Sequence, residues 1–275
     1  MMFSRLNPYF LVFSCLCFTA VVSCKSEGNK DGKASPDTLS LTAADSLRLD
    51  SVSRARAILS FADVLDSVYQ RAPKNVLSAL LRGHLRYAQD SAIIYPSAEK
   101  IPDSLARIKP FLLLTDIDLP QSPDRIFDMR RSMFIQLSSP ACLLNPKQIA
   151  VMEYAVQYSG TQVILVLANS NSRIIGAACD NVQTGSFATI TSELAKAMKT
   201  TQEFADRSSV NKDYVNHIAQ NQANLALIEI LRQSPQLKEL SDNGKIILKS
   251  AFYDGDKRSM VLLDPNASIN TLTKN

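Results

Sequence analysis

The sequence predicts an α/β fold, in which a four-stranded parallel sheet has helices on both faces and ends in a terminal antiparallel strand. From Phe111 onward, short apolar runs alternate with helical patterns, as in parallel sheets with crossover helices. The last two apolar runs are separated only by Asp254-Gly255-Asp256, a sequence typical of a hairpin turn. About 200 residues follow the export signal and linker described next, enough for one domain with a hydrophobic core.

The chain opens with an export signal at residues 1–23. Arg5 is the only charged residue before Lys25, and the apolar run Tyr9–Val22 is too short to span a bilayer comfortably. The run ends in Val-Val-Ser-Cys24, which resembles a bacterial lipobox, where the cysteine becomes the lipidated first residue. The alternative is an ordinary secretory signal that contains a cysteine.

A polar segment at residues 24–45 follows and is expected to be a flexible tether. A lipid on Cys24 would hold the protein in the bacterial cell envelope, facing the periplasm or the cell surface. The sequence does not indicate which membrane or leaflet.

Two helices are expected before the sheet. The first is amphipathic, spans residues 46–72 and is ended by Pro73. Its apolar stripe consists of Ala55, Ile58, Ala62, Leu65 and Tyr69. The second spans residues 75–90, with a stripe of Val76, Leu80, Leu81 and Leu85. Residues 91–110 contain three prolines and predict a surface excursion.

The core domain is expected at residues 73–265, with a tail at 266–275. Its strands are predicted at residues 111–114, 133–137, 163–167, 246–253 and 259–263. Its helices are predicted at residues 145–158, 187–205, 212–233 and 235–240. Asn145-Pro146 is a typical helix start, and Gly160 a typical helix stop.

Charge and cysteine content narrow the functional classes. All 26 acidic residues and all but one of the 30 basic residues follow the signal, without a basic block, so no nucleic-acid partner is indicated. Beyond Cys24 only Cys142 and Cys179 remain, and their proximity cannot be deduced from sequence. His84 and His217 are the only histidines, and we expect packing or surface roles for them. No Cys/His cluster has zinc-ligand spacing.

Residues 162–180, QVILVLANSNSRIIGAACD, resemble a motif of the β-class carbonic anhydrases, roughly V-L-G-H-T-x-C-G-A-V-K-G-A-C-D. Residues 113–128, LLTDIDLPQSPDRIFD, are similar to that family's V-L-S-C-x-D-S-R-x-P-P-E-x-I-F-D. Further matches in the same order are Gly83–Tyr87, Asn145–Val156, Ser234-Pro235, Gly244-Lys245 and Ala251–Asp254. The resemblance therefore implies a β-carbonic-anhydrase-like fold over most of the domain, and we expect a homodimer.

The departures from the family pattern fall on the zinc site. The three zinc ligands, Cys, His and Cys, correspond to Asp116, Asn169 and Ser172. The family's Asp is kept as Asp118, while the Arg that pairs with it corresponds to Pro120. Asn and Ser offer neither an imidazole nitrogen nor a thiolate, so they are poor zinc ligands. We expect no cofactor, with zinc present only if the family activity persists.

The polar residues at these positions define a candidate pocket of Asp116, Asp118, Asn169, Ser172 and Arg173. Two neighbouring carboxylates repel each other and need an offsetting interaction. One possibility is hydrogen bonding to Asp116 by Asn169 and Ser172, with Arg173 supplying a positive charge to both carboxylates. A hard cation such as Mg²⁺ or Ca²⁺ is the second. The third is that both carboxylates are solvated and inert.

The resulting functional hypothesis is a membrane-tethered, carbonic-anhydrase-like pseudoenzyme without zinc, in a binding or structural role. Two alternatives stay open. One is an enzyme, either an active carbonic anhydrase, which converts CO₂ and water to bicarbonate, or a catalyst of a different reaction that uses Asp116 and Asp118, so that enzymatic activity is undecided from sequence. The other is a lipoprotein that binds a small anion.

Overall fold

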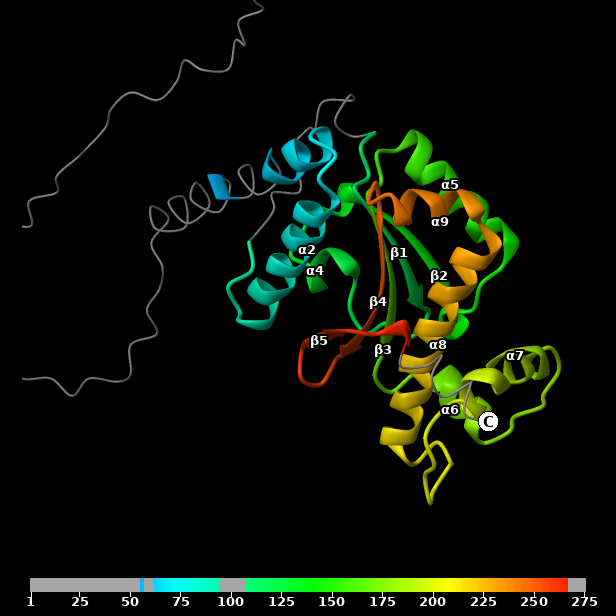
Figure 1. Cartoon of the computed structure of the whole chain (residues 1–275). Helices are drawn as coiled ribbons and strands as arrows, with labels where there is room; N and C mark the ends of the chain where they lie inside the picture. Colours follow the sequence, from blue (N-terminus) through cyan, green and yellow to red (C-terminus); the bar gives the residue numbers. More distant parts are fainter. Residues whose placement is uncertain (1–54, 57–61, 94–106, 267–275) are drawn as a thin grey trace, which may run out of the picture. The chain divides into compact units, whose positions relative to one another are not determined.

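The computed structural model describes residues 55–56, 62–93 and 107–266 (Figure 1). The predicted signal, the lipidation site Cys24, the tether and most of the tail lie outside the described residues. Among the residues described, no helix combines the length and apolarity that crossing a membrane requires.

The predicted sheet is confirmed. It has five strands in the order β2-β1-β3-β4-β5, and only β5 runs antiparallel to its neighbour. The strands are β1 Phe111–Asp116, β2 Phe134–Ser139, β3 Val163–Asn169, β4 Ile247–Asp254 and β5 Ser259–Leu262. Every residue of β1 and β3 is buried, because these central strands are covered on both faces.

Two hydrophobic clusters, one on each face of the sheet, make up the core. Leu112 and Leu114 of β1 pack on one face with apolar residues of α5 Pro146–Tyr158 and α8 Lys212–Gln233. Phe111 and Leu113 pack on the other with α2 Pro73–Ala88 and α4 Pro123–Ile126. Figure 1 shows α2 and α4 on one side of the sheet and α8 and α9 on the other.

Further helices are α6 Arg173–Cys179, α7 Phe187–Lys199 and α9 Pro235–Asp242, and residues 62–69, before α2, are also helical. Two 3-10 turns occur at Arg131–Met133 and Pro140–Cys142. Helix α5 starts as predicted, because the Asn145 side chain accepts from the Gln148 N–H in a capping box. Helix α6 was not predicted, and α7 ends at Lys199 rather than near residue 205.

The apolar stripes of the first two helices were predicted only in part. In the first, Leu65 is buried, but Ala55, Ala62 and Tyr69 are exposed, and Val64 and Val68 make the contact instead. Helix α2 buries Val76 and Leu80 as expected, whereas Leu85 is exposed. Its buried face continues through Gly83, His84 and Tyr87, residues that an apolar pattern does not mark. His84 is a packing residue there, and its Nδ1 lies 3.1 Å from the Ile126 carbonyl.

Candidate functional site

The parallel pairing of β1 with β3 brings the predicted pocket residues to one edge of the sheet. Strand β1 ends at Asp116 and β3 ends at Asn169, so both residues lie at the carboxyl edge although 53 positions separate them in sequence. Asp118 follows β1, and Ser172 and Arg173 follow β3 at the start of α6. Ligands of open α/β sheets gather at this edge.

The Asp116 side chain lies inside a shell of donors. The residue is 2% exposed, and its Oδ1 accepts from the Ala141 N–H at 3.0 Å and from the Asp118 N–H at 3.4 Å. The nearby Ser172 hydroxyl also lowers the pKa of the carboxyl. Ala141 has a φ of 48°, a left-handed conformation that turns its N–H toward Asp116. Backbone donors therefore satisfy this carboxylate.

Burial raises the pKa of the Asp116 carboxyl, and the nearby Ser172 hydroxyl and the N–H groups of Ala141 and Asp118 oppose that rise only in part. A raised folded-state pKa means that the folded protein binds the proton more tightly than the unfolded chain does. This contribution to stability is complete below the unfolded pKa and is lost as the pH rises through the folded pKa. The charged carboxylate thus lowers stability at neutral pH.

Asp116→Asn should therefore remove the loss of stability that the charged Asp116 carboxylate causes at neutral pH. Near pH 3 the variant should unfold within about 1 kcal/mol of the wild type, because the two side chains are then both neutral and nearly isosteric. At pH 7 the variant should be more stable relative to the wild type than at pH 3. Urea unfolding at the two pH values measures the difference.

Asp180→Asn provides a control of opposite sign. Ser209 donates two hydrogen bonds that lower the pKa of Asp180, so that variant should lose stability relative to the wild type as the pH rises from 3 to 7. The same pH trend for both variants would contradict the environment described for Asp116.

Asp118 caps α6, the helix that follows β3. Its Oδ2 accepts from the N–H groups of Arg173 at 3.0 Å and Ile174 at 3.2 Å. The Arg173 guanidinium pairs with Asp118 Oδ1 at 2.9 Å. The Arg173 side chain is 89% exposed, so this ion pair is mostly solvated and contributes little. The backbone contacts, which join the β1 loop to α6, are the structural role of Asp118.

Two predicted contacts of the pocket were wrong. Asn169 does not donate to Asp116, because its Nδ2 donates to the carbonyls of Asp118 at 3.4 Å and Ser170 at 3.1 Å. Its Oδ1 has no hydrogen-bond partner among the described residues, although Asn169 is only 1% exposed. Arg173 contacts Asp118 rather than both carboxylates. Asp116 instead accepts a hydrogen bond from the backbone N–H of Ala141, a donor that the sequence did not suggest.

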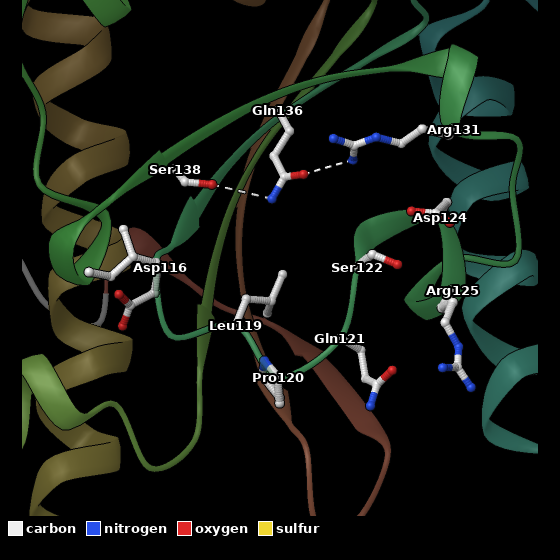
Figure 2. A pocket seen from close by; sticks show the side chains of 11 residues that line it. Asp116, Leu119, Pro120, Gln121, Ser122, Asp124, Arg125, Arg131, Gln136 and Ser138 are labelled. Atoms are coloured by element: carbon white, nitrogen blue, oxygen red, sulfur yellow. Dashed lines mark hydrogen bonds between the residues drawn. The ribbon is translucent and has the colours of Figure 1, made fainter.

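A cleft of about 370 Å³ opens beside Asp116 (Figure 2). Figure 2 shows Asp116 at one end of the cleft and Arg125 and Arg131 at the other. Arg131 donates to Gln136 Oε1 at 2.7 Å, and Gln136 Nε2 donates to Ser138 at 3.3 Å. Sequence reasoning missed this row, although Gln136 and Ser138 at alternate positions of β2, each following an apolar residue, were a usable signal.

Of the predicted pocket residues, only Asp116 lines this cleft, together with Pro120 of the family pattern. Asn169 donates to the Asp118 carbonyl, and Ser172 and Arg173 line a different cavity, of about 580 Å³. Pro120 lies in the loop after β1, where a Cβ added to Gly255 would come within 3.0 Å of its Cγ. The loop therefore packs against the β4–β5 turn.

The two thiols of the domain are free and do not form a disulfide. Cys142 is fully buried next to Asp116, and burial raises its thiol pKa well above the usual range. Burial likewise raises the pKa of Cys179 to about 11. Both thiols are protonated at neutral pH, so neither supplies a thiolate for metal binding or nucleophilic attack.

The residues that the sequence resemblance places at the three zinc-ligand positions do not fit zinc. Asp116 uses its carboxylate to accept backbone hydrogen bonds, and the Ser172 hydroxyl accepts from the Ile175 N–H. Asn169 offers a neutral amide oxygen, a poor zinc donor. Within the described ranges, no group of three or more His, Cys, Asp or Glu side chains is placed to hold a metal ion.

Comparisons with known proteins identify the family. A family model described as carbonic anhydrase matches residues 121–260, about half of the chain. A search of the curated proteins finds no match.

Several solved β-carbonic anhydrases are similar in structure. One of two tetrameric enzymes from the filamentous ascomycete Sordaria macrospora is 18% identical, with 56% of this chain and 80% of that chain covered at a TM-score of 0.49. CafA of Aspergillus fumigatus is 16% identical, with 60% and 82% covered at a TM-score of 0.49. The Coccomyxa enzyme in complex with acetazolamide is 16% identical, with 68% and 86% covered at a TM-score of 0.48. By its match to the family model, this chain belongs to the β-carbonic anhydrase family.

Proposed function

We propose that this protein is a pseudoenzyme of the carbonic anhydrase family, one that binds no zinc, does not hydrate CO₂ and acts in a binding or structural role. The observation that carries the proposal is the donor set at the three ligand positions. None of Asp116, Asn169 and Ser172 offers an imidazole nitrogen or a thiolate. Their polar groups instead join the β1 loop to the loop after β3.

The chemistry of CO₂ hydration explains why this change abolishes activity. Zinc lowers the pKa of its bound water from about 15.7 to about 7 and so provides hydroxide at neutral pH. Without it, the hydroxide fraction at pH 7 falls by roughly eight orders of magnitude. Asp116 cannot replace it, because a carboxylate does not acidify water to that degree.

Hydrogen bonding takes over the structural role that zinc has in the family. In place of a metal, the Ala141 N–H donates to Asp116, Asn169 donates to the Asp118 carbonyl, and Asp118 caps α6. These contacts connect the same two strand-end loops that a zinc ion would connect. The edge of the sheet is thus held together without a cofactor.

The zinc content of the purified protein tests this proposal. After expression in zinc-supplemented medium and dialysis against a chelator, elemental analysis should find well below one zinc per chain. A β-carbonic anhydrase with its three ligands intact, treated in parallel, should retain about one. One zinc per chain surviving dialysis would contradict the proposal.

A lipid anchor on Cys24 is the second part of the proposal. It is supported by the apolar run that ends in Val-Val-Ser-Cys24 and by the polar tether that follows. The wild type, expressed in a bacterium, should fractionate with membranes and incorporate labelled palmitate. Cys24→Ala should lose the label and leave the membrane fraction, whereas Cys17→Ala, a change within the signal, should behave as the wild type does. Equal labelling of Cys24→Ala and the wild type would exclude a lipid on this cysteine.

A further inference from the structure

A cavity of about 570 Å³ lies at the amino-terminal edge of the sheet, opposite the edge that carries Asp116. Thr161 and Gln162, which lead into β3, line it together with Ile246, which leads into β4. The Gln162 carbonyl accepts from the Ile247 N–H at 2.8 Å and so fixes this residue between the two strands. Seven residues of β3, about 20 Å of extended chain, separate the cavity from the family site.

The cavity is electropositive. The exposed side chains of Arg71 and Lys245 line it, and no carboxylate does. Neither cation forms an ion pair with another residue in the described part of the chain. The other two cavities described in this structure each include two aspartates, Asp116 and Asp124 in one and Asp180 and Asp256 in the other. The cavity at the amino-terminal edge therefore favours an anion.

Gln162 contributes an unused acceptor. The residue is 8% exposed, and its Nε2 donates to the Val68 carbonyl at 2.7 Å. Its Oε1 is buried and has no hydrogen-bond partner among the described residues. Leaving such an oxygen unpaired is unfavourable, and a ligand with a hydroxyl or N–H donor can relieve that cost. Thr161 is already engaged, since its hydroxyl donates to the Lys109 carbonyl at 2.6 Å.

The remaining walls combine apolar and polar side chains. The apolar ones come from Val68, from Val156 near the end of α5, and from Leu240 and Ile246 around the end of α9, and Gln157 and Gln236 add polar groups. Small-molecule sites commonly combine such apolar walls with a few polar groups that fix the orientation of the ligand. We propose that this cavity binds a small hydroxycarboxylic acid, whose carboxylate faces Arg71 and Lys245, whose hydroxyl donates to Gln162, and whose short alkyl group contacts the apolar walls.

Calorimetric titration of the full-length protein in detergent tests this with three probes. 2-Hydroxy-4-methylpentanoate has all three features, 4-methylpentanoate lacks the hydroxyl, and 2-hydroxy-4-methylpentanamide lacks the charge. The hydroxy acid should bind saturably at one site per chain, with a Kd below about 1 mM, and the other two about tenfold more weakly. Absence of saturable binding of the hydroxy acid up to about 10 mM would overturn the proposal.

Variants locate the site. Arg71→Gln and Lys245→Gln change exposed side chains, so both should fold, and each should weaken binding of the hydroxy acid about tenfold. Gln162→Leu should reduce the preference for the hydroxy acid over 4-methylpentanoate to near unity. Lys199→Gln removes an equally exposed charge on α7, far from the cavity lining, and should leave the Kd unchanged. Wild-type affinity in both Arg71→Gln and Lys245→Gln would exclude this cavity. The cavity does not include the residues at the zinc positions. Binding or its absence therefore tests this proposal alone and leaves the prediction about zinc content untouched.

Discussion

Replacing Gly83 by alanine should destabilise the domain by about 3 kcal/mol or more. A Cβ at this position would lie 1.8 Å from the carbonyl oxygen of Phe127 and 2.9 Å from its carbonyl carbon. These are backbone atoms at the end of α4, so no side-chain rotation relieves the clash. One turn along α2, Arg86 pairs with Asp128 and holds the two helices together. Accommodating the methyl group would require breaking that contact.

This loss of stability is opposite in sign to the change that helix propensity predicts for Gly→Ala. In an exposed helix interior, Gly→Ala stabilises by about 1 kcal/mol. Gly176→Ala in α6 is the matched control, because the added Cβ would lie 3.3 Å from the Ser209 Cβ and only a small adjustment is needed. Thermal unfolding should show a drop of roughly 6–12 °C for Gly83→Ala and a change of less than about 3 °C for Gly176→Ala. Equal melting temperatures for Gly83→Ala and the wild type would contradict the close packing of α2 on α4.

The sheet could be predicted from sequence because its strands are marked locally. Residues 111–114 and 163–167 are continuous apolar runs, as strands buried on both faces are, and the structure pairs them as neighbours. Helix α6 could not be predicted in the same way. It has seven residues, and its N-terminal N–H groups are capped by Asp118, which lies 55 positions earlier in the sequence. The helix also has a local cap, since Ser172 accepts from the Ile175 N–H, but seven residues are too few to show a periodic apolar pattern.

For the candidate site, the sequence predicted where residues lie but not which groups they contact. Sequence was sufficient to place Asp116 and Asn169 at one sheet edge, since both follow adjacent parallel strands. It did not reveal their hydrogen-bond partners, because these are mostly backbone groups. The Ala141 N–H reaches Asp116 only through a left-handed residue that is not glycine, a conformation that the sequence Ser-Pro-Ala-Cys does not predict. The amide of Asn169 is taken by two carbonyls of the neighbouring loops.

The largest expected effect concerns catalysis. Added zinc should not restore CO₂ hydration, because the missing element is the donor set and not the supply of metal. The Asn169 amide and the Ser172 hydroxyl would have to replace an imidazole and a thiolate, and both are neutral oxygen donors at neutral pH. Since the hydroxide supplied by zinc accounts for roughly eight orders of magnitude, partial occupancy of a weak site would still fall far below the activity of an intact enzyme.

Stopped-flow measurement of CO₂ hydration by the full-length wild type, with and without excess zinc, tests the central claim most directly. A β-carbonic anhydrase with intact ligands serves as the positive control at the same concentration. The rate with this protein should equal the buffer rate under both conditions. A zinc-dependent rate above buffer that a chelator removes, and that Asn169→Ala abolishes, would show a working metal site and contradict the assignment as a pseudoenzyme.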